Sequence, residues 1–164
     1  MHIFVAAIAA VAVQPLVFLI RVAPAYFAST TPVYGLGLYL AAVVVVAAAG
    51  VLLLGIPTFL LLLRFGRANW TSVAISGFFL GMLPAAISWP RRLEGYSSGE
   101  NWHGKYVDTY VQGVPTSYAW LTYAEGVLFF GLHGLAGGLV FYAVWRRIQP
   151  LADIPRQDGS RPQD

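Results

Sequence analysis

The chain has 164 residues, of which 58% are hydrophobic and only 10% are charged, and its net charge is +3. A soluble domain typically has roughly a quarter of its residues charged, so this composition excludes a water-soluble globular protein, which could not bury so much apolar surface. The absence of cysteine excludes disulfides and thiolate metal sites, and the sequence offers no soluble basic face for nucleic acid.

Four apolar segments are each long enough to cross about 30 Å of hydrocarbon as a helix that rises 1.5 Å per residue. We expect these helices at residues 3–28, 34–63, 68–89 and 119–145. The predicted fold class is therefore all-α, a polytopic membrane protein whose residues 1–147 form a four-transmembrane-helix bundle. Residues 90–118 are predicted to form one periplasmic loop, and residues 148–164 a disordered cytoplasmic tail.

The first segment contains a charge, Arg21, and we expect the helix to continue past it to Ala28. Ala23-Pro24-Ala25 weakly resembles a signal-peptide cleavage site, and cleavage there would leave three helices and an N-terminus outside the cell. However, the two residues before the apolar run include no lysine or arginine, which favours a retained helix. The residues from Ser29 to Pro32 are predicted to form a tight connection.

The second segment is longer than a span requires, so we expect it to tilt or kink. Pro57 is the expected kink point, because it cannot donate a hydrogen bond to the carbonyl of Leu53.

Small residues recur at four-residue spacing in the third and fourth segments. They include the pair Gly77 and Gly81 and the pair Gly134 and Gly138. Glycines on one helix face let two backbones approach closely in a membrane, so we expect these two helices to pack together. The alternative is that one of these faces forms a homodimer interface.

The second half of the predicted loop alternates in part between apolar and polar residues and contains the dipeptide Gln112-Gly113. This pattern predicts a short β-hairpin or an extended segment that caps the bundle.

Arginines indicate the orientation of the chain, because basic residues concentrate in cytoplasmic loops. Two of them lie between the second and third segments, and four follow the last segment, namely Arg64, Arg67, Arg146, Arg147, Arg156 and Arg161. We therefore expect a multi-pass protein of the bacterial inner (cytoplasmic) membrane with both termini in the cytoplasm.

A few polar residues fall within the apolar segments, where a charge costs at least ~2.5 kcal/mol and normally has a partner. Arg21 and Glu125 lie at similar predicted depth, so we expect them to form an ion pair that acts as a packing clip or, alternatively, as a gate or cation site. His133 is predicted near the midplane, either as a neutral hydrogen-bonded side chain or in a proton-relay or substrate role. Gln14 is expected to form an interhelical hydrogen bond.

No pattern in the sequence predicts catalysis, a metal or a cofactor. His103 and His133 lie in the loop and in the membrane respectively, so they have no metal-ligand spacing. Gly35-Leu36-Gly37 lacks the rest of a dinucleotide fingerprint. We expect no catalytic residues, no metal and no cofactor.

One resemblance rests on two glycine-containing stretches. The first runs from Gly55-Ile56-Pro57 through Arg64 to Trp70 and on to Gly77–Pro84, and the second runs from Gly131 to Gly138. These stretches resemble a pattern in an uncharacterised family of small bacterial four-helix integral membrane proteins with no assigned activity. The resemblance implies four transmembrane helices, and it assigns no functional role to any residue of this chain.

The sequence thus favours a non-enzymatic accessory or interaction protein of the inner membrane, either a subunit or assembly partner of a membrane complex or an immunity-type protein. Its expected partners are the lipid bilayer and a protein partner or a second copy of itself, with no nucleic acid. The alternative is a small oligomeric transporter or channel that uses Glu125 and His133, and a weaker one is a membrane-embedded enzyme.

Overall fold

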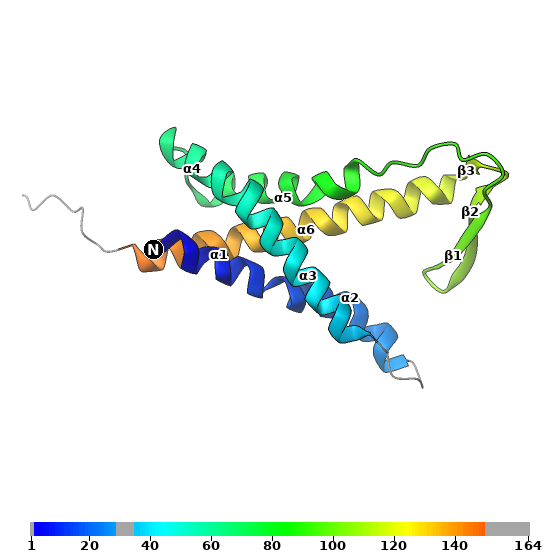
Figure 1. Ribbon diagram of the computed structural model, residues 1–164, viewed down its shortest axis with the longest axis horizontal. Helices are drawn as coiled ribbons and strands as arrows, with labels where there is room; N and C mark the ends of the chain where they lie inside the picture. The colour runs from blue at the N-terminus through cyan, green and yellow to red at the C-terminus, as the bar shows by residue number, and fades with distance from the viewer. Residues whose placement is uncertain (1, 29–34, 150–164) are drawn as a thin grey trace, which may run out of the picture.

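A computed structural model of the chain describes residues 2–28 and 35–149. The structure is mostly helical, as predicted, with one small sheet (Figure 1). The elements in chain order are α1 (His2–Ala12), α2 (Gln14–Ala28), α3 (Leu36–Gly50), η1 (Val51–Gly55), α4 (Ile56–Arg64), α5 (Trp70–Ala86), β1 (Ser98–Trp102), β2 (Lys105–Val111), β3 (Val114–Pro115) and α6 (Ser117–Ile148). Three predicted features lie outside the described residues. They are the connection over residues 29–32, the start of the second predicted helix at residue 34, and the tail from residue 150 onward.

Three helical segments among the described residues are long and apolar enough to cross a membrane: His2–Val22, Leu36–Arg64 and Ser117–Ile148. The remaining apolar helix, α5, has 17 residues and is shorter than the predicted range 68–89. The structure is therefore compatible with membrane association, and the count of four spans stays a prediction.

The first predicted helix is divided into two at Val13, which separates α1 from α2. Pro15 has no N–H to donate, so the regular ladder of backbone hydrogen bonds cannot run through this point. The N–H of Val17 donates to the carbonyl of Val13 at 3.2 Å, which restarts the ladder. Because α2 then continues to Ala28, Arg21 lies within a helix.

The second predicted helix has its irregularity just before Pro57. Residues Val51–Gly55 form a π-helical turn, and the N–H of Ile56 donates to the carbonyl of Val51. Pro57 follows directly in the first turn of α4, and its missing N–H interrupts the backbone hydrogen bonds of this helical segment at that point. In Figure 1, the continuous α3–η1–α4 segment runs obliquely to α5 and α6.

Helices α5 and α6 lie side by side along the length of α5 (Figure 1), and two tyrosines of α6 fix the ends of α5. The hydroxyl of Tyr142 donates to the carbonyl of Ala68 at 3.1 Å, just before α5 begins. The hydroxyl of Tyr123 donates to the carbonyl of Ala86 at 2.9 Å, where α5 ends. The N-cap of α5 is Asn69, whose side chain accepts from the N–H of Ser72.

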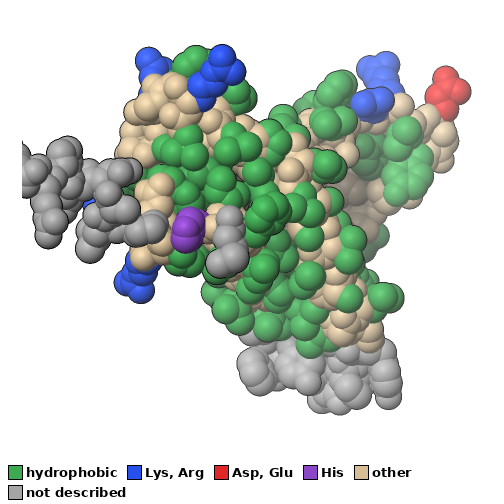
Figure 2. Space-filling view, turned by 60° about the vertical axis from the view of Figure 1, so that its left-hand side comes forward, with side chains coloured by type: hydrophobic (Ala, Val, Ile, Leu, Met, Phe, Trp, Pro, Cys, Tyr) green, Lys and Arg blue, Asp and Glu red, His purple; other side chains and the backbone are tan. Residues whose placement is uncertain are grey.

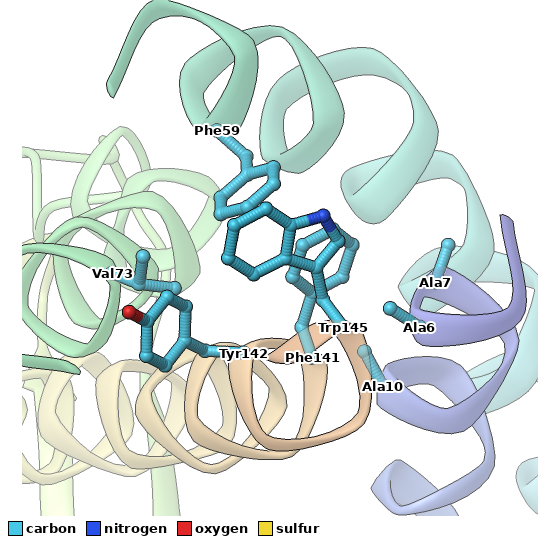
Figure 3. Close-up of a cluster of buried hydrophobic side chains, with 8 residues drawn as sticks. All are labelled: Ala6, Ala7, Ala10, Phe59, Val73, Phe141, Tyr142 and Trp145. Atoms are coloured by element: carbon cyan, nitrogen blue, oxygen red, sulfur yellow. The ribbon is translucent and has the colours of Figure 1, made fainter. Parts of the chain in front are cut away.

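The main apolar core lies where α1, α4, α5 and α6 meet, at the end of the bundle near the chain's N-terminus (Figure 3). The ring of Phe59 makes edge-to-face contacts with Phe141 and Trp145, with ring centroids 4.8 and 4.9 Å apart. The members of this core are Ala6, Ala7, Ala10, Phe59, Val73, Phe141, Tyr142 and Trp145. The alanines of α1 let this helix approach the aromatic rings closely.

The predicted loop contains an antiparallel sheet with strand order β1-β2-β3. Both turns have two residues with positive φ: His103 and Gly104 at 49° and 81°, and Gln112 and Gly113 at 47° and 82°. These are the values of the type I′ turns that match the twist of a hairpin. The hairpin predicted at Gln112-Gly113 is present, and the one at His103-Gly104 is an addition that the sequence analysis does not predict.

Candidate functional site

The carboxylate of Glu125, two turns into α6, is the meeting point of three elements. The Nη2 atom of Arg21, from α2, lies 3.4 Å from its Oε1 atom. The Nε1 atom of Trp102, at the end of β1, donates to its Oε2 atom at 2.8 Å. The Nε2 atom of His103 lies 3.4 Å from the same oxygen. We call these four residues the Glu125 cluster.

The predicted contact between Arg21 and Glu125 is thus present, but it is not deeply buried. The exposed fractions of the two side chains are 48% and 37%. The guanidinium of Arg21 also lies over the ring of Phe129, 4.4 Å from its centroid, which is the geometry of a cation–π contact. Because its oxygens are already bonded to cationic or N–H groups, Glu125 fits a clip between elements better than a site for a free cation.

The two other members of the cluster, Trp102 and His103, belong to the tip of the β1–β2 hairpin. The ring of Trp102 packs edge-on against His103 and Tyr118, with centroids 4.7 and 5.6 Å away. These contacts and the bond to Glu125 hold the hairpin tip against α6. Sequence reasoning missed both residues, and the only local signal was the dipeptide His103-Gly104, a turn sequence just before the partly alternating run.

Gln14 forms the interhelical hydrogen bond that its position predicts. Its Nε2 atom donates to the carbonyl of Ala10 in α1 and to the carbonyl of His133 in α6, both at 3.2 Å. A Cβ at Gly137 would lie 2.7 Å from this nitrogen, so a side chain there would displace the Gln14 amide. Gln14 therefore joins the break between α1 and α2 to the middle of α6.

His133 is buried, with 8% of its surface exposed. Its Nδ1 atom lies 3.1 Å from the carbonyl oxygen of Phe129, one turn earlier in α6. A carbonyl can only accept, so in the neutral imidazole the proton lies on Nδ1 and Nε2 is left as an acceptor. The ring also packs against that of Phe129, with centroids 4.3 Å apart.

A groove of about 500 Å³ lies between α3–η1–α4 on one side and α5 and α6 on the other. Gln14 and His133 are among its lining residues, whereas Arg21 and Glu125 are not. The structure therefore brings together Gln14 with His133, and Arg21 with Glu125, but it does not join these two pairs in one cavity.

The four predicted glycines meet between α5 and α6. A Cβ at Gly77 would collide with the carbonyl oxygen of Gly134, and one at Gly81 would lie 2.9 Å from the Cα of Gly134. A Cβ at Gly138 would lie 2.9 Å from the carbonyl oxygen of Val73. These faces are used within one chain, so they are not free to form the homodimer interface considered as an alternative.

Among the described residues, no three His, Asp or Glu side chains could hold a metal ion together. Comparison of the chain with protein-family models, with curated proteins and with solved structures finds no match.

Proposed function

We propose that the chain is a four-span protein of the bacterial cytoplasmic membrane that acts as a non-enzymatic accessory or interaction protein. It would serve as a subunit or assembly partner of a membrane complex, or as an immunity-type protein. Figure 2 supports a lipid-embedded body: hydrophobic side chains cover most of the face shown, and charged side chains lie at its margins. Lipid can solvate such a surface, whereas water cannot.

Helix α5 is the proposed fourth span. Its 17 residues span about 26 Å at 1.5 Å per residue, slightly less than the ~30 Å hydrocarbon layer. It packs against the 32-residue α6 through the glycines, and the two tyrosine hydrogen bonds fix both of its ends. A helix paired so closely with a long apolar helix is expected to enter the membrane with it.

The arrangement of the helix ends supports a cytoplasmic position for both termini. The start of α1, the end of α4 and the end of α6 lie toward one end of the molecule, and the sheet lies at the other (Figure 1). The arginines Arg64, Arg146 and Arg147 lie at those helix ends. By the positive-inside rule, that end would face the cytoplasm and the sheet would face the periplasm.

The observation that carries the interaction role is the attachment of the sheet to the helices. The bond from Trp102 to Glu125 holds the hairpin in a defined orientation, and the sheet and the segment before it expose apolar side chains. They are Leu93, Tyr96, Tyr106, Val111 and Val114. Exposed apolar side chains on an element held in a fixed orientation are typical of a site for a protein partner, because such an element loses little entropy on binding.

The transporter or channel alternative has less support. A polar path would have to join Glu125 to His133, but Glu125 is bonded to the hairpin and Arg21, and it does not line the groove that contains His133.

A photo-crosslinking residue at Tyr106, whose exposed fraction is 68%, tests this proposal in cells. We expect one discrete protein adduct, identified by mass spectrometry, and the same adduct should weaken when Trp102→Phe releases the hairpin from Glu125. Leu38, exposed on α3, is the matched lipid-facing control and should give no such adduct. No protein adduct at Tyr106, or the same adducts from both positions, would contradict the interaction role.

A further inference from the structure

The groove between α3–η1–α4 and helices α5 and α6, here called the groove beneath α3, is lined by two buried polar side chains. In each of them, the atom that makes no hydrogen bond is an acceptor. His133 and Gln14 line it with exposed fractions of 8% and 7%. Among the described residues, Nε2 of His133 and Oε1 of Gln14 have no hydrogen-bond partner. Within the part of the chain that the structure describes, no fully buried side-chain nitrogen or oxygen lacks a partner, so both atoms keep some accessible surface. Both side chains line the groove.

The hydrogen bonds already made by these side chains fix what they can still bind. Nδ1 of His133 donates to the carbonyl of Phe129, which leaves Nε2 with a lone pair only. Both hydrogens of the Gln14 amide donate to backbone carbonyls, which leaves Oε1 with lone pairs only. A ligand that satisfies this pair must supply hydrogen-bond donors. Esters, ethers and ketones supply none.

The rest of the groove is apolar and partly aromatic. Aromatic rings come from four helices, namely Phe18, Tyr39, Phe59, Phe129, Phe130 and Phe141. A volume of about 500 Å³ lies within the ~300–1,000 Å³ range of small-molecule sites, which are typically apolar with a few convergent polar groups. A flat aromatic ligand would stack against these rings.

The position of the acceptors along the helices narrows the class of ligand further. His133 lies near the middle of the 32-residue α6, far from either end of the helix. A glycerolipid keeps its free hydroxyl at the headgroup level, whereas a hydroquinone ring on an apolar tail can carry its hydroxyls into the hydrocarbon. We propose that the groove binds the hydroquinone form of a membrane quinone, with its hydroxyls donating to His133 and Gln14.

Binding of two ligands to the purified full-length protein tests this proposal without any mutation. The probes are 2-decyl-1,4-dihydroxybenzene, kept reduced under anaerobic conditions, and its dimethyl ether, which has the same ring and tail but no donor. We expect calorimetry to show that the ether binds at least about tenfold more weakly, because it leaves two buried acceptors unpaired. The oxidised quinone, which also has no donor, should resemble the ether. Equal affinities for the hydroquinone and the ether, or binding of neither, would overturn the proposal.

Two variants locate the site. His133→Phe keeps an aromatic ring but removes the acceptor, so hydroquinone affinity should fall toward that of the ether. A Cβ at Gly50 would meet no atom within 4 Å, and Gly50 lines the groove, so Gly50→Phe should fill it and abolish binding without disturbing the helices. Hydroquinone binding that survives in folded Gly50→Phe would overturn the proposal even if His133→Phe fails to fold. The crosslink from Tyr106 does not depend on this groove, so the two proposals can fail separately.

Discussion

Glycine has opposite consequences in two regions of this molecule. Between α5 and α6, glycines bring the two backbones into direct contact, and a Cβ at Gly77 or Gly134 would strike the backbone of the other helix. In α3, Gly37 and Gly50 have no atom within 4 Å of where a Cβ would lie. The first region is closed, whereas in the second Gly50 borders the open groove.

The difference follows from pairing and not from the number of glycines. Gly77 and Gly81 are four residues apart and lie on one helix face, and Gly134 and Gly138 form a matching pair on α6. Gly37 and Gly50 meet no such partner. Small residues therefore permit a close helix contact only where a second small-residue face opposes them.

The largest expected effect breaks the closed contact. Gly134→Ala should destabilise the protein by about 3 kcal/mol or more, because the added methyl overlaps the backbone at Gly77 and neither backbone can move far. The matched control is Gly126→Ala in the same helix, where a Cβ meets no atom within 4 Å. It should be neutral or stabilise the helix by up to about 1 kcal/mol. Thermal unfolding in detergent measures both, and equal melting temperatures would show that α5 and α6 are not in contact.

A smaller effect is expected at the Glu125 cluster. Glu125→Gln should cost about 1–3 kcal/mol, because the carboxylate loses a charged hydrogen bond from Trp102 and its contact with Arg21. Arg21→Met should cost about 1 kcal/mol or less, since the pair is partly exposed. If the two residues interact, the double variant should be more stable than the sum of the single effects implies. Strictly additive effects would mean that the ion pair does not form.

The tyrosine bonds that fix α5 to α6 are expected to contribute less. Tyr123→Phe and Tyr142→Phe each remove one hydrogen bond to a backbone carbonyl and should cost about 0.5–1.5 kcal/mol. Tyr106→Phe, at an exposed position of the sheet, is the control and should leave the melting temperature unchanged. A loss at Tyr106 equal to that at the two helix positions would argue against the bonds at the ends of α5.

The smallest effect is expected at the hairpin turn. His103→Asn should change stability by less than about 0.5 kcal/mol, because the exposed contact with Glu125 is weak and Asn-Gly is a preferred type I′ turn. His103→Val should cost more, since a β-branched residue is strained at the positive φ of this position. Circular dichroism and thermal unfolding of the two variants separate the effect of the turn conformation from that of the contact with Glu125. A larger loss of stability in His103→Asn than in His103→Val would contradict the expectation.

The contacts that could be predicted from the sequence are those set by helix periodicity. Regular spacing placed the glycine pairs on opposing faces, and the rise per residue placed Arg21 and Glu125 at similar depth. The Trp102 bond could not be predicted, because it depends on the register of a hairpin whose turn, His103-Gly104, is only a weak signal. The division at Val13 and the π-helical turn at Val51–Gly55 were also missed, although Pro15 and Pro57 mark their neighbourhoods.

The groove beneath α3 could not be predicted from the sequence at all. It depends on the oblique path of α3–η1–α4 relative to α5 and α6, and this path follows from tertiary packing, not from any local pattern. Gln14 and His133 were recognised as interior polar residues, but that they line one cavity could only be seen in three dimensions.

The pairing of α5 with α6 predicts that α5 crosses the membrane, and one measurement tests this most directly. The chain has no cysteine, so Phe65→Cys and Glu100→Cys, at exposed positions that flank α5, would each provide its only thiol. In intact spheroplasts, a membrane-impermeant maleimide should label the cysteine at position 100, and the one at position 65 only after the membrane is opened. Labelling of both from the same side would show that α5 does not cross, and the four-span arrangement would be wrong.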